Sequence, residues 1–266
     1  MNDVHRRGLR LCAEHAKRSV QIRDEPLKID TSERAGERIQ EHRGAVIYQI
    51  FVEEPPPPKI AFQTRIAARK DAGAGLLLVA LEPPASAAAA HLRPGQYVWL
   101  GAWFVLASAP GHSNWEVVLR PAGDAAIKLA TAPIGTAIDA AGPFGEGFPM
   151  AIGEALVIAA TGGAIAAVRA IMDCRIEHGD AKSTQLFLGV RTRAELPLQD
   201  EVAEWTKAGA DVVICISSED ARVQDVARKR MNAPAGTTLL LAGHPGMIDA
   251  MKALAAERGL VAHVNY

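Results

Sequence analysis

Three glycine-containing turns in the second half of the chain hold residues that could bind a nucleotide phosphate. The first follows the apolar run "EALVIAA" and consists of Thr161, Gly162 and Gly163, ahead of a helical pattern. Glycines at such a turn let a phosphate approach the backbone, and a helix N-terminus offers free N–H groups and the positive end of its dipole. Taken alone, this turn is explained equally well as a tight turn without a ligand.

The other two turns also follow apolar runs. Gly189 ends the run "STQLFLG", and Arg191 and Arg193 come just beyond it. An arginine in that place can pair with a phosphate or remain an ordinary solvated side chain. The third turn follows "TTLLLAG", and its His244 is either a proton donor or a simple loop histidine. Its residues are Gly243, His244, Pro245, Gly246 and Met247, with the proline suited to the first turn of a helix.

The elements that must position these turns divide the chain into two kinds of fold. Residues 151–266 alternate apolar strand runs with helical patterns such as "AAVRAIMDCRIEHG", which predicts a parallel sheet with helices on its faces. Ligands of such sheets bind at the carboxyl ends of the strands. Residues 59–150 are instead short strand-like runs between Gly/Pro turns. They predict a small antiparallel β-barrel or sandwich ahead of the α/β domain.

Residues 1–58 form a charged extension that closes on four consecutive prolines. A proline run favours an extended spacer and makes a natural domain boundary. Asp30 and Glu33 resemble a capping box that opens a short helix, and "AVIYQIFV" has the composition of a strand. This extension could bind a partner, or a second copy of the chain, by strand addition.

Composition argues against several classes of function. The chain has 29 basic and 30 acidic residues, so no strong field attracts nucleic acid or an anionic membrane. No apolar run reaches the roughly 20 residues that a spanning helix requires. Cys12, Cys174 and Cys215 are scattered, with no CxxC pair and no secretory leader, so we expect a cytoplasmic protein. They form no cluster for an iron–sulfur centre, and no metal site is predicted.

The order of the motifs resembles the ferredoxin–NADP reductase family over residues 60–266. Further counterparts of the family's motifs are "PGQY" at residues 94–97 and "GPFGEGF" at residues 142–148. The resemblance implies a flavin-binding barrel followed by a pyridine-nucleotide domain. In such proteins a hydride passes between nicotinamide and flavin N5, and the flavin exchanges electrons with a second partner. The nucleotide contacts that it implies are Thr161, Gly162, Gly163, Gly189, Arg191, Ser217, Ser218, Gly243, His244, Pro245 and Met247.

The residues that would hold the flavin depart from the family's pattern. The signature R-x-Y-S-x-x-S falls on residues 102–108, of which only Ser108 is retained. Ala102 replaces the phosphate-pairing arginine, Phe104 the ring-stacking tyrosine, and Val105 the serine that faces flavin N5. In the second flavin element, G-G-x-S, the serine has become Ala126. Because a hydrogen bond to a charged group contributes about 1.5–3 kcal/mol, these losses would weaken flavin binding by about two to four decades.

We expect weak or partial FAD occupancy rather than none, because backbone N–H groups do most of the holding of the flavin ring. Arg120 or Lys128 could replace the lost positive charge. Tyr266, in the final "HVNY", either lies against the flavin or simply closes the last strand. The resemblance makes Val105 and Tyr266 the candidate catalytic positions. The flavin contacts that it implies are Phe104, Val105, Leu106, Ala107, Ser108, Arg120, Gly123, Ala125 and Ala126.

Coenzyme choice depends on residues 217–220. Where NADPH-selective relatives place Ser-Arg, this chain has Ser217 and Ser218 followed by Glu219 and Asp220. Two carboxylates repel a 2′-phosphate but accept hydrogen bonds from ribose hydroxyls, so NADH is preferred over NADPH. Arg191 or Arg222 could compensate for this repulsion.

Two hypotheses of function follow from these residues. The first is a flavin-dependent NAD(P)H oxidoreductase that passes electrons to an unidentified redox protein or small acceptor. The second is a non-catalytic nucleotide-binding or structural subunit of a larger complex. It is motivated by Val105, Ala126 and Ala242, the last of which stands where the family has a cysteine.

Overall fold

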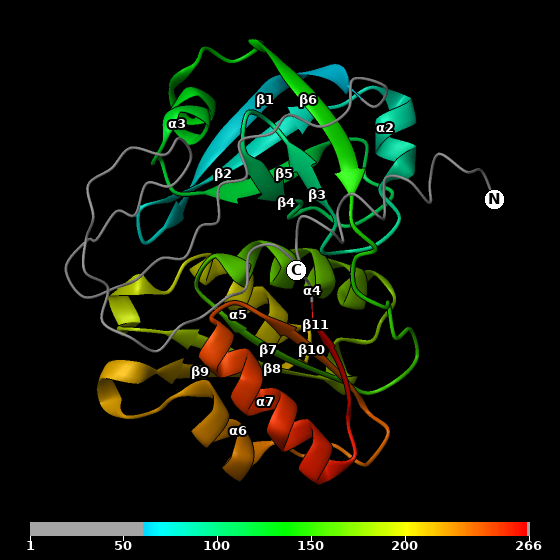
Figure 1. Ribbon diagram of the computed structural model, residues 1–266, viewed down its shortest axis with the longest axis vertical. Helices are drawn as coiled ribbons and strands as arrows, with labels where there is room; N and C mark the ends of the chain where they lie inside the picture. Colours follow the sequence, from blue (N-terminus) through cyan, green and yellow to red (C-terminus); the bar gives the residue numbers. More distant parts are fainter. Residues whose placement is uncertain (1–60, 265–266) are drawn as a thin grey trace, which may run out of the picture. The chain divides into compact units, whose positions relative to one another are not determined.

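The computed structural model describes residues 61–264, which contain two β-sheets and their covering helices (Figure 1). The helix and strand expected in residues 1–58, and Tyr266, lie outside the described residues. The first sheet consists of β1 (Ala61–Gly73), β2 (Leu76–Glu82), β3 (Tyr97–Trp99), β4 (Trp103–Val105), β5 (Trp115–Leu119) and β6 (Ala137–Phe144). Two helices, α2 (Ala85–Ala90) and α3 (Asp124–Thr131), lie in its connections.

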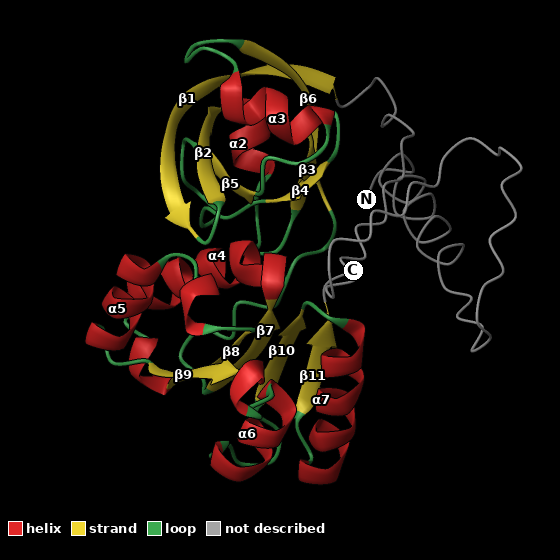
Figure 2. Ribbon diagram, turned by 90° about the vertical axis from the view of Figure 1, so that its left-hand side faces the viewer, coloured by secondary structure: helices red, strands yellow, loops and turns green. Residues whose placement is uncertain are grey.

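The first sheet is antiparallel, in the order β4-β3-β6-β1-β2-β5, and its strands form a ring in Figure 2. Alternating burial along β5, where Trp115, Val117 and Leu119 are buried, gives the sheet an apolar inner face. The edge strands meet at an isolated bridge between Leu106 and Val117, beside a 2.6 Å hydrogen bond from the Ala107 N–H to the Glu116 carbonyl. The predicted antiparallel barrel is therefore confirmed as a barrel-like sheet, whose seam between β4 and β5 has this isolated bridge in place of a continuous ladder and is not fully closed.

The second sheet is parallel, as predicted, in the order β11-β10-β7-β8-β9. Its strands are β7 (Leu156–Thr161), β8 (Thr184–Val190), β9 (Asp211–Ile216), β10 (Thr238–Ala242) and β11 (Val261–Val264). Its helices are α4 (Ile165–Glu177), α5 (Gln199–Lys207), α6 (Val223–Arg230) and α7 (Pro245–Arg258). The strand order reverses between β7 and β10, so the ends of these two strands flank the place where such sheets bind ligands.

Both faces of this sheet are covered, which explains its continuous apolar runs. Along β7, Leu156 and Ile158 pack in a cluster with α4 and α5, whereas Val157 and Ala159 pack in a cluster with α6 and α7. Figure 2 shows these helix pairs on opposite faces of the sheet. The cluster on the α4 side also includes Ala107 and other residues of the barrel, so one apolar core continues from the α/β sheet to the barrel.

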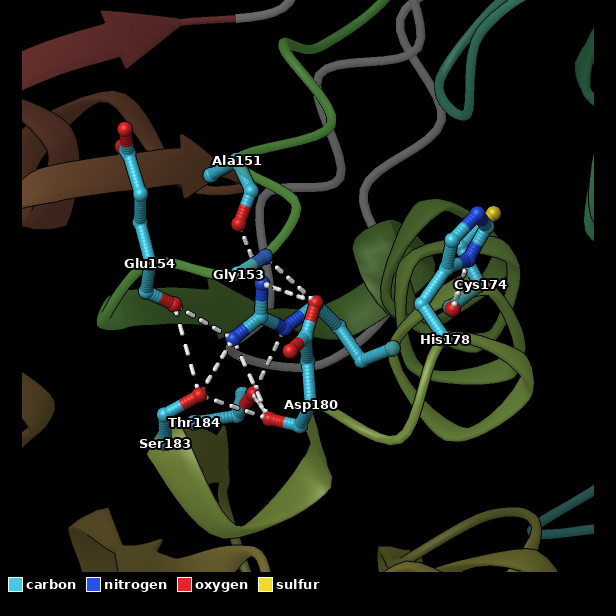
Figure 3. Close-up of polar contacts among 9 residues, drawn as sticks. Ala151, Gly153, Glu154, Cys174, His178, Asp180, Ser183 and Thr184 are labelled. Atoms are coloured by element: carbon cyan, nitrogen blue, oxygen red, sulfur yellow. Dashed lines mark hydrogen bonds and ion pairs between the residues drawn. The ribbon is translucent and has the colours of Figure 1, made fainter.

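A buried arginine holds the segment that connects the two sheets. Arg175, on α4, is 1% exposed and donates to the carbonyl oxygens of Ala151 and Glu154 in this segment (Figure 3). It also donates to Thr184 Oγ1 at 2.9 Å and pairs with the Asp180 carboxylate at 3.4 Å. The guanidinium thus satisfies backbone acceptors that the connecting segment would otherwise bury without a partner.

Candidate functional site

Thr161, the last residue of β7, connects two of the glycine turns. Its Oγ1 accepts a hydrogen bond from the backbone N–H of His244 at 2.8 Å, across the reversal of strand order. A Cβ on Gly243 would lie 2.6 Å from the Thr161 carbonyl oxygen, and Gly243 has a φ of +122°. The close approach and the backbone angle both require glycine at this position.

The remaining turn, after β8, lies on the other side of Thr161. Thr161 pairs with Gly189 in the β7–β8 ladder, and a Cβ on Gly189 would lie 2.7 Å from the Thr161 methyl carbon. Arg191, two residues further on, is exposed, and its carbonyl accepts from the Ser218 N–H at 3.0 Å. The structure therefore brings together the residues that the sequence placed at the ends of β7, β8, β9 and β10.

The turn after β7 has open space beside it. Gly162 and Gly163 are exposed in a 3₁₀ turn, Gly162–Ala164, that leads directly into α4. A Cβ on either glycine would meet nothing within 4 Å. No side chain caps α4, and its first N–H, that of Ile165, already donates to the carbonyl oxygens of Gly162 and Gly163. The N–H groups that fit an incoming phosphate are therefore those of the 3₁₀ turn that precedes the helix.

His244 caps α7 in this structure. Its Nδ1 accepts from the Gly246 N–H at 3.1 Å, which places the ring hydrogen of the neutral form on Nε2. Pro245 occupies the first position of the helix, as expected, and is exposed. Met247 is 5% exposed and packs in the core, so its side chain does not face the open edge of the sheet.

The β9 end is polar and exposed. Ser217, Ser218 and Glu219 form a 3₁₀ turn, and Asp220 follows in the left-handed region with a φ of +55°. Arg222 follows at the N-cap position of α6, where its side chain makes no capping hydrogen bond. Carboxylates and guanidinium groups therefore stand close in sequence at this strand end, and no fixed ion pair among them is present in the described structure.

The flavin-signature strand presents a different face from the one that the resemblance implied. Phe104, expected to stack on the flavin, is 8% exposed and packs inside the barrel. Leu106 points into the same core. Trp103 and Val105 flank Phe104 on the strand, and both are partly exposed. Trp103 and Val105 therefore lie on the outer face of β4, where a ligand could contact them, whereas the Phe104 ring packs in the core.

Val105 packs against the core shared by the barrel and the α/β sheet. It is partly buried and packs against the apolar cluster that includes Ile165, the first residue of α4. Ala107 and Ser108, which follow it, are buried in the barrel seam, where Ser108 Oγ accepts from the Glu116 N–H at 3.2 Å. Val105, the position expected to face flavin N5, thus packs against the apolar core that the barrel shares with the α/β sheet.

Four aromatic residues cluster on the outer side of β3, β4 and β6. The Trp103 ring lies 5.3 Å from Tyr97, 5.0 Å from Trp99 and 5.2 Å from Phe144, centroid to centroid. All four side chains are partly exposed. The sequence analysis did not single out this cluster, although the alternation of Tyr97 and Trp99 along a strand indicates a shared face.

The second flavin element lies against the first. A Cβ on Gly101, in the β3–β4 turn, would lie 3.3 Å from the Ala125 Cβ in the first turn of α3. Gly123 precedes this helix with a φ of +77°, and Ala126 is buried. Arg120, expected to supply positive charge, donates instead to the Ala74 carbonyl in the β1–β2 turn at 3.1 Å. The acidic Asp124 occupies the first turn of α3.

The two described thiols are structural. Burial raises the pKa of Cys174 to about 12 and that of Cys215 to about 11, so neither is a ready thiolate. Within residues 61–264, no group of three or more His, Cys, Asp or Glu side chains could hold a metal ion. None of the helices in this range is long and apolar enough to cross a membrane.

Comparison with known proteins agrees with this geometry. Residues 158–253 match the family described as the oxidoreductase NAD-binding domain. The reductase component of propane 2-monooxygenase from Mycolicibacterium goodii is 28% identical in a match that covers 59% of this chain and 53% of the relative. Its counterpart from Rhodococcus jostii is 26% identical in a match that covers 66% of this chain and 55% of the relative. The chain spans about half the length of these curated relatives.

A solved structure extends the match to the whole described fold. The ferredoxin NADP+ reductase from Neisseria gonorrhoeae, solved with bound FAD and NADP, superposes with a TM-score of 0.63 at 17% identity. The match covers 78% of this chain and 99% of that one. At this identity the similarity establishes the fold alone, a barrel-like sheet followed by a parallel sheet with helices on both faces.

Proposed function

This chain has the ferredoxin–NADP reductase-like fold and contains an oxidoreductase NAD-binding domain, and from these we propose that it is a flavin-dependent NAD(P)H oxidoreductase. The observation that supports this most strongly is the junction at Thr161. One threonine fixes the turns after β7, β8 and β10 around the open space beside Gly162 and Gly163. A pyrophosphate placed there would accept hydrogen bonds from the N–H groups of the 3₁₀ turn that leads into α4.

The residues of this chain fit the flavin ring better than they fit the flavin diphosphate. When bound, it would take a hydride from the nicotinamide and pass electrons onward. Trp103 would stack on the ring, and Val105 would keep water from the reacting edge, because both lie on the exposed side of β4. The diphosphate would meet Ala102 and Asp124 instead of a cation, so we expect weak FAD binding.

A second candidate function follows from the same departures. The first turn of α3 packs against the β3–β4 turn, and alanines stand in place of the groups that would bond a diphosphate. A chain that binds only the nicotinamide nucleotide would serve as a non-catalytic subunit of a larger complex.

An FAD titration followed by flavin fluorescence tests the binding half of the proposal. We expect saturable quenching of the flavin fluorescence. The Trp103→Leu substitution should weaken FAD binding by about tenfold at most, because stacking of an aromatic pair contributes about 0.5–1.5 kcal/mol. Leu92→Ala, which removes an exposed apolar side chain outside β4, is the control and should leave the affinity unchanged. Absence of quenching at millimolar FAD would favour the non-catalytic subunit.

We propose that NADH is the preferred coenzyme, because Glu219 and Asp220 follow β9 where a 2′-phosphate would approach. Glu219→Arg should raise the kcat/KM for NADPH by about tenfold or more, since it replaces repulsion with an ion pair. Steady-state rates with both coenzymes measure this. Glu257→Arg, on the exposed face of α7, is the matched charge change and should alter neither rate. Equal NADPH rates in Glu219→Arg and the parent chain would refute the assignment.

The electron acceptor is proposed to be a separate redox protein. The relatives from Mycolicibacterium goodii and Rhodococcus jostii are reductase components of propane 2-monooxygenases, so an oxygenase component is the kind of acceptor that we propose. We also keep the proposal that residues 1–58 bind this partner or a second copy of the chain. We place the enzyme in the cytoplasm, where NADH is available.

A further inference from the structure

Arg169 joins α4 to the seam of the barrel. Its Nη1 donates to the Ala107 carbonyl at 2.9 Å and to the Glu116 carboxylate at 2.6 Å. The side chains of Arg169 and Glu116 are 14% and 24% exposed, so this ion pair is largely shielded from water. A charge-assisted bond in such a place is stronger and better defined than one on the surface.

The two acceptors belong to opposite edges of the barrel-like sheet. Ala107 lies two residues beyond β4, and Glu116 lies on β5. They are joined directly by the hydrogen bond from the Ala107 N–H to the Glu116 carbonyl. Arg169 therefore bonds both edges of the seam. One of its two acceptors, Ala107, lies two residues after Val105 in the sequence.

The helix that carries Arg169, α4, begins at the turn that is proposed to bind the nucleotide, residues 161–164; we call it the nucleotide turn. α4 starts at Ile165, directly after Gly162–Ala164, and Arg169 lies about one turn further along. One rigid helical turn thus connects the place proposed for the pyrophosphate with the strand proposed for the flavin ring. A shift of Arg169 would change the spacing between these two places.

Other titratable groups surround this arginine. Asp173, one turn along α4, lies 3.5 Å from Arg169 Nη1. Burial raises the pKa of the Asp173 carboxyl to about 6; Arg169 and His112 oppose this rise, whereas Glu116 and Glu177 add to it. His112, in the β4–β5 connection, pairs with Glu177 at 2.8 Å and forms a second, more exposed link between barrel and helix.

We propose that Arg169 is the residue that positions the flavin strand against the nucleotide turn, so that nicotinamide and flavin meet at reacting distance. The inference rests on the proposed function. It assigns Arg169 no contact with either cofactor: the guanidinium acts through Ala107 and Glu116. Because a misplacement of about 1 Å can slow a reaction by about 100-fold, its loss should affect the reaction rate more than binding.

The test compares Arg169→Met with the parent chain loaded with FAD. Stopped-flow reduction at saturating NADH should be about 10–100-fold slower, with the Kd for NADH within about twofold of the parent value. Arg228→Met, which breaks the exposed ion pair with Glu257, is the control and should change neither quantity. Glu116→Gln keeps the shape of the acceptor and should give a smaller loss of rate. Adding it to Arg169→Met should cause little further loss, because the two changes break one bond.

A second readout needs no flavin. In the flavin-free chain, the seam amides of Ala107 and Glu116, which donate to the Glu116 carbonyl and to Ser108 Oγ, should exchange hydrogen at least about tenfold faster in Arg169→Met. The amides of α7 should not change. An unchanged reduction rate, or a rate loss matched by an equal rise in the Kd for NADH, would overturn the role of Arg169. Failure of NADH to reduce the flavin of the parent chain would instead refute the proposed function. In that case unchanged seam exchange would overturn the inference as well.

Discussion

At the scale of single residues, His91 is a buried histidine with a poorly bonded ring. It is 2% exposed, and within residues 61–264 neither ring nitrogen makes a hydrogen bond of good geometry, the Arg93 backbone offering only a weak one. Its ring packs edge-on against Trp115, 6.4 Å between centroids. Burial lowers the pKa of His91 to about 4, the Arg93 backbone opposes this shift, and the charge of His112 adds a smaller lowering, so the imidazole is neutral in the fold.

This burial makes the free energy of unfolding depend on pH. The unfolded chain takes up a proton on His91 near pH 6.5, whereas the folded chain does so only near pH 4, so stability falls as the pH drops through this window. At pH 4 the loss amounts to about 3 kcal/mol. His91→Leu should remove it, and urea unfolding at pH 7.5 and pH 4.5 measures the difference between the two chains.

The pH dependence of unfolding must be compared between variants, because the Asp173 carboxyl titrates in the same pH range and changes the free energy of unfolding in the opposite direction. The pKa of its carboxyl is raised to about 6, so its contribution favours folding as the pH falls. Asp173→Asn is therefore the control that separates the two groups. Unfolding curves that shift equally with pH in His91→Leu and in the parent chain would contradict the account of His91.

At the scale of elements, the turn between β10 and α7 depends on one glycine. Gly243→Ala should lower the free energy of unfolding by about 2 kcal/mol or more, because its Cβ would collide with Thr161 while φ stays positive. Gly236→Ala is the matched control: its φ is +84°, but its Cβ would meet nothing within 4 Å. It should cost only about 1 kcal/mol. Equal losses in the two variants would show that the close approach at Thr161 is not required.

The elements that the sequence predicted are those with strong periodic or continuous burial. The runs of β7 to β10 and the long helices α4 and α7 were expected, because core contacts on one or both faces leave a clear pattern. The short helices α5 and α6 were not, since each buries only two residues, such as Val202 and Trp205 in α5. The glycines allowed the turns of the candidate site to be predicted. That two of these turns contact each other at the Thr161 hydroxyl could not be predicted, because this contact depends on the order of the strands in the sheet, and no local sequence pattern specifies that order.

The orientation of Phe104 shows a second limit. Strand alternation predicts that Phe104 and Val105 face opposite sides, but it does not say which side is the core. The pairing of β4 with β3, and the seam at Leu106, decide this. The same long-range pairing left Trp103 on the outer face and placed Arg169 at the seam, so neither role could be read from the sequence.

At the scale of the whole molecule, the segment that connects the two sheets depends on Arg175. Arg175→Met should lower the free energy of unfolding by about 3–5 kcal/mol, because it leaves buried carbonyls and the Asp180 carboxylate without their partner. Arg258→Met is the control, since that arginine also bonds backbone carbonyls but is only partly buried. Thermal unfolding compares them. A similar fall in Tm for both would contradict the special role of Arg175.

The central claim joins both sheets: the nucleotide turn delivers a hydride to a flavin on the outer face of β4. Anaerobic addition of NADH to the chain in saturating FAD, followed by absorbance of the oxidised flavin band, tests it most directly. The account predicts bleaching of the bound flavin in proportion to the NADH added. A protein whose bound flavin keeps its oxidised spectrum, or that takes up NADH but no flavin, would contradict the oxidoreductase and leave the non-catalytic subunit.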